Sequence, residues 1–204
     1  MKTKDRIIDA AQELFFLQGI KRITVDDIAS HLGMSKKTLY ENFKEKDVIV
    51  RQLTKRYLHE RELIFNQITD NSKNAVHDML QMMDLLYVTF RSINPQVFYD
   101  MQKYHPEAWK DFRKFKEEFV MDHVERNLQR GIKQKLYRSD LNTKVLCRLR
   151  MEQVEMGLNP LLFPPTKFDI TAVQLSLLDH FLHGICTLEG LALIKEYRYN
   201  SQNQ

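Results

Sequence analysis

Apolar residues recur every three or four positions along most of this 204-residue chain, which is the spacing of one face of an α-helix. In the first expected helix this stripe runs through Ile7, Ala11 and Phe15 and stops near Gly19. The same spacing predicts helices from about residue 45 to the polar joint at 71–74, over 76–90, over 109–123, and two long helices over about 141–158 and 168–197. Since no alternating apolar and polar run bounded by hairpin turns occurs, the pattern predicts an all-α fold.

Two short helices are predicted directly after the first. Thr24 is a good N-cap, and Asp27 three residues later completes a near capping-box arrangement for a helix that ends near His31 or Leu32. Gly33 interrupts the pattern, and Ser35 caps a further short helix that ends near Phe43.

The spacing of three residues within these short helices is that of a helix-turn-helix. Ala29 is small enough for a second helix to cross over it, Gly33 tolerates the positive φ of a tight turn, and Leu39 anchors the second helix from its inner side. Ile28, Leu32, Met34 and Phe43 complete the small core. The sequence therefore predicts an N-terminal three-helix domain with a helix-turn-helix.

The second helix of this motif has a basic and aromatic face. Lys36, Lys37 and Tyr40 fall within an arc of about 100° on a helical wheel. Paired lysines are usually solvated surface residues, but a helix laid in the major groove presents such a face to base edges. Glu41 follows Lys37 by four residues and either accepts from a base or pairs with Lys37.

Hydroxyl and basic side chains around this helix suit the phosphate backbone. Thr24 and Ser35 stand at helix N-termini, and Lys44 and Lys46 begin the following helix. The predicted DNA-binding residues are Thr24, Ser35, Lys36, Lys37, Thr38, Tyr40, Asn42, Lys44 and Lys46.

Charge is distributed unevenly along the chain. The formal net charge is +4, and residues 1–56 alone hold 12 Lys and Arg against 8 Asp and Glu, so the remainder is balanced. This excess suits a polyanionic partner of the N-terminal region. The two cysteines, Cys147 and Cys186, are expected to be reduced and buried, as in a cytosolic protein.

Nothing in the hydrophobic pattern predicts a membrane segment. Asp5, Asp9 and Glu13 interrupt the apolar residues of the N-terminus, so it does not read as a signal peptide. No apolar run approaches the ~20 residues that cross a bilayer. We expect a soluble, cytoplasmic protein without a membrane partner.

The segment TVDDIASHLGMSKKTLYENFKEKDVI, together with Phe15 and Gly19, resembles the TetR family of bacterial transcriptional regulators. The matching positions are Thr24, Ile28, Ala29, Gly33, Ser35, Thr38, Tyr40, Phe43 and Lys46. The resemblance implies a helix-turn-helix domain over residues 1–46 and a helical ligand-binding and dimerisation domain over 47–204. It also implies a homodimer that reads a pseudo-palindromic operator and releases it when a ligand moves the fourth helix. Asn42 departs from the family, whose members often carry His or Tyr-like bulk there.

The last long helix is apolar over an arc of about 220°, more than the ~100° that packing on one side requires. The extra width favours a partner subunit, and the alternative is a central helix of a monomer. The predicted dimer-interface residues are Val173, Leu177, Leu178, Phe181, Leu182 and Ile185.

Methionine and aromatic residues gather between positions 79 and 121, and they are first of all core residues. Adaptable methionines and amphipathic aromatics also suit a pocket for an unidentified, partly apolar or aromatic small molecule. The candidate pocket residues are Met83, Phe90, Tyr104, Trp109, Phe112 and Met151.

Catalysis has little support in the sequence. No activated nucleophile, Gly-rich phosphate loop or Glu-x-x-His pair is present, and Glu152 and Glu155 lack a His companion. His180 and His183 fall on the polar side of their helix, so no metal or other cofactor is predicted. The favoured function is a ligand-released, DNA-binding repressor and not an enzyme. The alternatives are an activator or coactivator of the same family, and an all-α ligand-binding protein without DNA binding.

Overall fold

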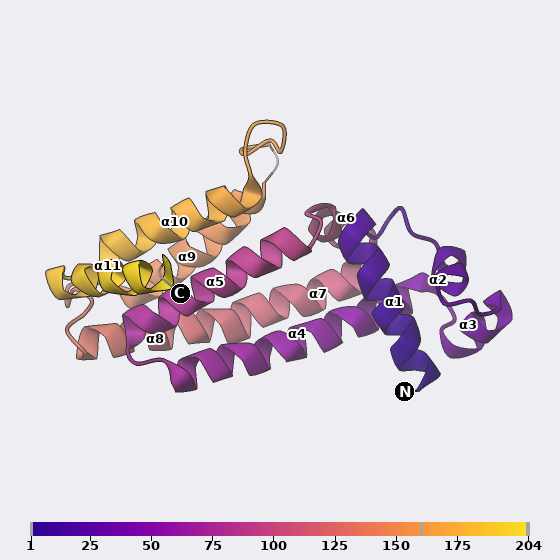
Figure 1. The fold of residues 1–204 in the computed structure, drawn as a ribbon, viewed down its shortest axis with the longest axis horizontal. Helices are drawn as coiled ribbons and strands as arrows, with labels where there is room; N and C mark the ends of the chain where they lie inside the picture. The colour runs from indigo at the N-terminus through magenta and orange to yellow at the C-terminus, as the bar shows by residue number, and fades with distance from the viewer. Residues whose placement is uncertain (1, 160, 203–204) are drawn as a thin grey trace. The chain divides into compact units, whose positions relative to one another are not determined.

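A computed structural model of the chain describes residues 2–159 and 161–202. It contains the helices α1 (Thr3–Gln18), α2 (Val25–His31), α3 (Lys36–Asn42), α4 (Lys46–Asn71), α5 (Ala75–Ser92), α6 (Gln96–Tyr104), α7 (Pro106–Lys114), the π-helical turn η1 (Phe115–Val120), α8 (Met121–Lys133), α9 (Thr143–Leu158), α10 (Ile170–Ile185) and α11 (Leu188–Gln202) (Figure 1). The described residues form no β-strand, which confirms the all-α prediction. An isolated β-bridge pairs Tyr137 with Cys186.

The chain divides into two compact units. Unit 1 comprises Met1–Glu62 and Phe90–Phe115, and unit 2 comprises Leu63–Thr89 and Lys116–Gln204. Helix α4 therefore contributes residues to both units. These units are defined by packing, and the predicted division into functional domains after residue 46 stays a prediction.

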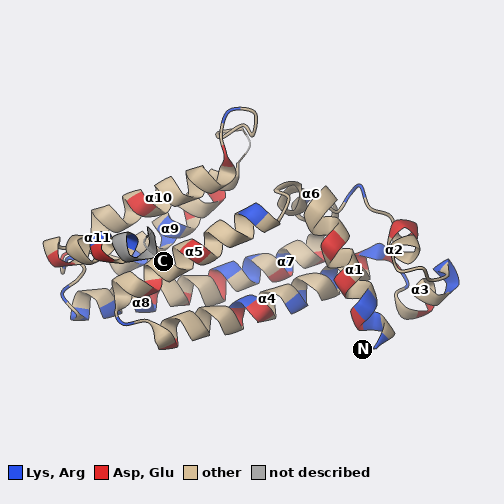
Figure 2. Ribbon diagram, viewed as in Figure 1, with Lys and Arg blue, Asp and Glu red and all other residues tan. Residues whose placement is uncertain are grey.

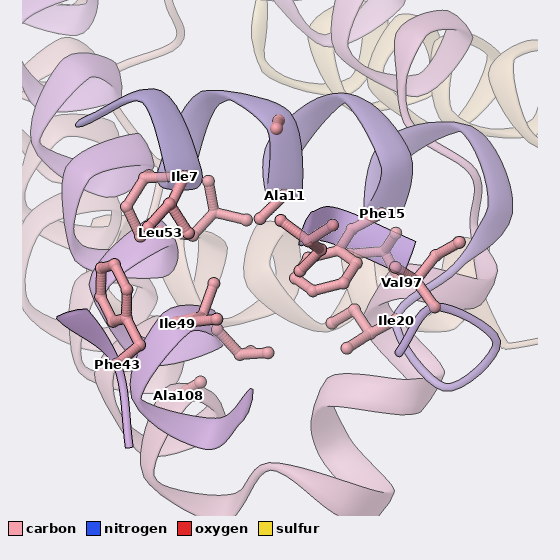
Figure 3. Close-up of a cluster of buried hydrophobic side chains, with 14 of the residues drawn as sticks. Ile7, Ala11, Phe15, Ile20, Phe43, Ile49, Leu53, Val97 and Ala108 are labelled. Atoms are coloured by element: carbon pink, nitrogen blue, oxygen red, sulfur yellow. The ribbon is translucent and has the colours of Figure 1, made fainter. Parts of the chain in front are cut away.

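The core of unit 1 forms around the predicted apolar stripe of α1 (Figure 3). Ile7, Ala11 and Phe15 are completely buried, and they pack with Ile49 and Leu53 of α4. Val97 of α6 and Ala108 of α7 belong to the same cluster. Burying a large aliphatic or aromatic side chain stabilises a fold by about 1.5–3 kcal/mol, so this cluster holds the N-terminal helices against α4.

A buried carboxylate joins α6 to the loop after α1. Asp100 is 1% exposed, and its Oδ2 accepts from the backbone N–H of Lys21 at 2.7 Å while Oδ1 accepts from Nε2 of Gln96 at 2.8 Å. Gly19, which caps α1 with φ +86°, lies next to both side chains. These bonds fix the loop that leads into α2.

Unit 2 has its own core, built from α5, α8, α9 and α10 with Ile194 of α11. Tyr137 is completely buried there, and its hydroxyl donates to the carbonyl oxygen of Ala75 at 3.0 Å. Gly131 is obligatory beneath it, because a Cβ at that position would lie 2.0 Å from the Tyr137 ring. Among the helices of this unit, α9 packs against both α8 and α10.

The expected single helix over about 168–197 is wrong. The structure ends α10 at Ile185 and begins α11 at Leu188. The chain leaves the helix because the carbonyl of Ile185 accepts from Arg138 N at 2.9 Å and the amide of Thr187 donates to Leu136 O at 2.9 Å. The hydroxyl of Thr187 then accepts from Gly190 N at 3.2 Å and so caps α11.

No helix in the described part of the chain is long and apolar enough to cross a membrane. Cys147 and Cys186 are both buried and free, as expected from the sequence.

Candidate DNA-binding site

Helix α2 begins with the capping box that the sequence predicts. The Thr24 hydroxyl accepts from the backbone N–H of Asp27 at 3.1 Å, and the Asp27 carboxylate accepts from the backbone N–H of Thr24 at 2.8 Å. The hydroxyl of Thr24 also donates to this carboxylate, and these bonds lower the pKa of Asp27. Both ends of the turn entering α2 are thereby fixed.

The turn between α2 and α3 depends on Gly33. Its φ is +61°, a conformation that side chains with a Cβ rarely adopt, and no atom would obstruct a Cβ there. Directly after it, Met34 N donates to Ala29 O at 3.0 Å. The Ser35 hydroxyl then accepts from Thr38 N at 3.1 Å and caps α3. The predicted helix-turn-helix is confirmed in each of these features.

One side of α3 is buried and the other faces solvent. Leu39 is completely buried and Phe43 is 1% exposed, so both anchor the helix to the core of unit 1. Lys37 and Glu41 are exposed, and Tyr40 is 48% exposed. Figure 2 shows basic residues on α3 and at the beginning of α1. The exposed Lys37 and Tyr40 therefore lie next to the side of α3 that Leu39 and Phe43 anchor to the core.

Lys37 and Glu41 do not pair with each other. Neither side chain makes an ion pair with any residue that the structure describes. Lys37 is thus available to an incoming anion, and whether Glu41 contacts a base is left open.

Lys36 has a partner that the sequence did not reveal. Its ammonium forms an ion pair with the carboxylate of Asp26 on α2, and this contact raises the pKa of Lys36. In the sequence, the only indication of this ion pair was the presence of an acidic residue in the first turn of α2. Its pairing with a residue ten positions away depends on how α2 and α3 cross, which the sequence does not give.

Lys46, predicted to flank the DNA backbone, is turned inward. Its Nζ donates to Ile20 O at 2.6 Å and lies 5.7 Å from the centre of the Phe15 ring. Burial lowers the pKa of Lys46. In this structure the lysine ties the start of α4 to the loop after α1, whereas Lys44 is exposed.

Thr38 and Asn42 interact along α3 itself. Asn42 donates from Nδ2 to the Thr38 carbonyl at 2.8 Å, and the Thr38 hydroxyl lies 2.9 Å from that of Ser35. Both side chains are half-buried, so each presents only an edge to a ligand.

The predicted pocket residues are distributed over both units. Phe90, Tyr104, Trp109 and Phe112 belong to unit 1, where the rings of Trp109 and Phe112 stack at 5.3 Å. Met83 and Met151 belong to unit 2 and pack in its core. The sequence-based set therefore does not gather within one core.

Most of the predicted dimer-interface residues are buried within their own chain. Leu178, Phe181, Leu182 and Ile185 are at most 3% exposed and pack in the core of unit 2. Val173 is 9% exposed and Leu177 is half-buried. A partner that contacts α10 would therefore meet its opposite side, which carries Ser176, His180, His183 and Gly184.

Helix α9 exposes an apolar stripe that the sequence reading missed. Val145 is 59% exposed, Leu149 45% and Met156 38%. Their spacing of four and seven residues places them on one side of the helix. The sequence-level signal was present, but the side of α9 that the core would bury was unknown.

No group of three His, Cys, Asp or Glu side chains in the described residues is arranged to hold a metal ion. His180 and His183 are both exposed, and His183 Nδ1 lies 2.9 Å from the Asp179 carbonyl.

Comparison with known proteins links the helix-turn-helix to a family. The family model for bacterial regulatory proteins of the tetR family matches residues 7–53. The HTH-type transcriptional regulator YvaF of Bacillus subtilis (strain 168) is 32% identical over 100 residues, which cover 48% of this chain and 53% of that protein. The chain thus spans about half the length of this curated relative.

Solved structures share the fold over most of the chain. A TetR-family regulator from Agrobacterium tumefaciens superposes with a TM-score of 0.74 at 16% identity, covering 90% of this chain and 97% of that one. A transcriptional regulator from Saccharomonospora viridis, solved in complex with choline, gives the same TM-score, identity and coverage. At this identity the likeness shows the fold alone.

Proposed function

Because the chain belongs to the TetR family of bacterial transcriptional regulators, we propose that α3 binds in the major groove of an operator and that the protein regulates transcription from it. A member of this family is a regulator and not an enzyme. We propose that it acts in the cytoplasm, where its DNA partner lies.

The observation that carries this proposal is the exposed pair Lys37 and Tyr40 beside the buried Leu39. Lysine donates to the O6 and N7 of guanine, and a tyrosine ring packs on a thymine methyl or donates to a phosphate. We assign direct base contacts to Lys37 and Tyr40. Lys36 joins them when its bond to Asp26 opens. The phosphate contacts are assigned to Thr24, Ser35, Thr38, Asn42 and Lys44.

We further propose a homodimer that reads two half-sites. A single α3 of seven residues covers only a short base sequence, and a second copy related by twofold symmetry extends it to a pseudo-palindrome. The outward faces of α9 and α10 support such an interface. Val145, Leu149 and Met156 are exposed there, and Gly184 has no atom near the place of its Cβ. An apolar stripe of this kind is a marker of protein contact.

A small molecule bound in unit 2 is proposed to release the operator, which makes the protein a repressor. The similar regulator from Saccharomonospora viridis was solved with choline, which supports a ligand-responsive body. Helix α4 contributes to both units, so displacement of its C-terminal part by a ligand is carried along one continuous helix.

The test is a fluorescence anisotropy titration of the purified protein on a duplex selected from random sequence. Lys37→Ala and Tyr40→Ala are each expected to weaken binding by about tenfold, the cost of one good base contact. Lys144→Ala, an exposed lysine on α9, is the matched control and should bind as the wild type does. Unchanged affinity and salt dependence in both α3 variants would refute the assignment of the recognition helix.

A further inference from the structure

Arg150 on α9 is a buried cation without an acidic partner. Its side chain is 3% exposed, and it makes no hydrogen bond or ion pair with any described residue. Nη1 in particular is completely buried with no acceptor. Burial alone lowers the pKa of Arg150 to about 10, so the group stays protonated at neutral pH. An uncompensated buried charge is strongly unfavourable, and proteins rarely keep one without a use for it.

Two buried amides on α9 and α10 each have an oxygen atom without a hydrogen-bond donor. Gln153 and Gln174 are 8% and 1% exposed, and the Oε1 atom of each has no donor. Nε2 of Gln174 donates to the carbonyl oxygen of Val154 at 2.8 Å, which leaves Oε1 of Gln174 as the free acceptor. Gly157 makes room for this amide, because a Cβ at that position would lie 2.5 Å from its nitrogen.

These groups share one side of the α9 and α10 pair. Arg150, Val154 and Gly157 follow one another at spacings of four and three residues, so they form one stripe on α9. The contacts of Gln174 with Val154 and Gly157 show that this stripe faces α10. Gln153 is one helical turn from Arg150. The guanidinium and the amide oxygens therefore belong to one polar region between the two helices.

This region lies beside the apolar core of unit 2, and the buried acid of that unit pairs with other residues. Met151 and Phe181 flank the stripe in the core of unit 2. The buried Asp78 of this unit lies 3.8 Å from Arg130 and 3.4 Å from His123. Asp78 is thus a buried charge with cationic partners, whereas the buried Arg150 has no acidic partner among the described residues.

We propose that Arg150 binds the anionic group of a partly apolar small molecule, such as a carboxylate or another oxyanion, between α9 and α10. The planar guanidinium matches two carboxylate oxygens with two parallel hydrogen bonds. Oε1 of Gln174 accepts from a hydroxyl or amide N–H of the same molecule, and Met151 packs on its apolar part. This inference rests on the proposed ligand-responsive role of unit 2 and adds the chemical class of the ligand.

The test measures calorimetric binding of benzoate, octanoate and inorganic phosphate to the full chain, with benzyl alcohol and 1-octanol as neutral counterparts. The wild type is expected to bind a carboxylate at least about tenfold more tightly than its neutral counterpart, as a charge-assisted pair implies. Arg150→Met should abolish this preference, and Arg126→Met, an exposed arginine of α8, should keep it. If the wild type binds the anionic and the neutral probes with equal affinity, the proposal is overturned, and no measurement on a variant is needed.

Stability separates a binding role from a structural one. Because the unpaired charge is removed while the apolar stem is retained, Arg150→Met should have a Tm equal to or above that of the wild type. A Tm well below the wild-type value, or an anion preference that survives the substitution, would mean that the guanidinium only supports the fold.

Operator titrations with these probes keep the two proposals distinguishable. Selective carboxylate binding that leaves the DNA affinity of the wild type unchanged would keep the Arg150 site and refute ligand-released regulation. Operator binding by a protein with no anion preference would keep the DNA-binding proposal and refute the Arg150 site.

Discussion

The ammonium of Lys36 at the start of α3 pairs with the carboxylate of Asp26 at the start of α2. Both side chains are about half exposed or more, so the pair adds little to the stability of the fold. We expect the pair to affect DNA binding instead, because it occupies one of the basic groups of α3 and adds an acid beside it. We therefore expect Asp26 to lower the DNA affinity of the helix-turn-helix.

Replacing Asp26 with Asn is expected to tighten operator binding. The change frees Lys36 for a phosphate or base contact and removes one charge that repels DNA, so the salt slope should steepen by about 1. Anisotropy titrations over a series of salt concentrations measure both quantities. In a Lys36→Met background the gain should be much smaller. An equal gain there would show that Asp26 acts only through general charge repulsion.

The capping box at Thr24 is expected to stabilise unit 1. Thr24→Ala removes the acceptor for Asp27 N and should lower the free energy of unfolding by about 1 kcal/mol. Thr24→Ser keeps the hydroxyl and is the matched control. Urea unfolding followed by circular dichroism measures the difference, and equal midpoints for the Ala and Ser variants would contradict the role of the cap.

How well a feature of this protein could be predicted from the sequence depends on how far apart in sequence the interacting residues lie. The caps of Thr24 and Ser35 and the turn at Gly33 depend on neighbours within a few residues, so the helix-turn-helix could be predicted almost residue by residue. The pairing of Lys36 with Asp26 and the bond from Lys46 to Ile20 O depend on packing between helices, and they could not.

The break at Thr187 shows the same limit in the fold. Local periodicity continues through Cys186 and Thr187, and the nearby Gly184 and Gly190 lie inside α10 and α11 and not at the break itself. The helix ends because Leu136 and Arg138, about 50 residues earlier, pair with the backbone at 185–187. Tertiary hydrogen bonds therefore override helical propensity, and a single sequence does not reveal them.

The apolar stripe of α9 is expected to hold the dimer together. Leu149→Glu places a charge in the centre of the stripe and should shift sedimentation from dimer to monomer, because a buried unpaired carboxylate is costly at an interface. Since Leu149 is 45% exposed in the single chain, the fold itself should tolerate the change. Lys144→Glu on the same helix is the control for charge alone. A Leu149→Glu protein that stays dimeric would show that the dimer interface lies elsewhere.

The two buried thiols are expected to make the stability of the fold decrease as the pH rises through the alkaline range. Burial raises the pKa of Cys147 and of Cys186 from the ordinary 9.0 to about 11. Since the unfolded chain ionises these thiols first, their contribution to stability is complete below pH 9 and is lost as the pH rises towards 11. We expect the free energy of unfolding of the wild type to fall more steeply over this range than that of the Cys147→Ala, Cys186→Ala double variant. Urea titrations at pH 8, 9, 10 and 11 measure both curves. Parallel curves would show that the thiols are not desolvated, and fast labelling of the native protein by a thiol reagent at pH 8 would show the same.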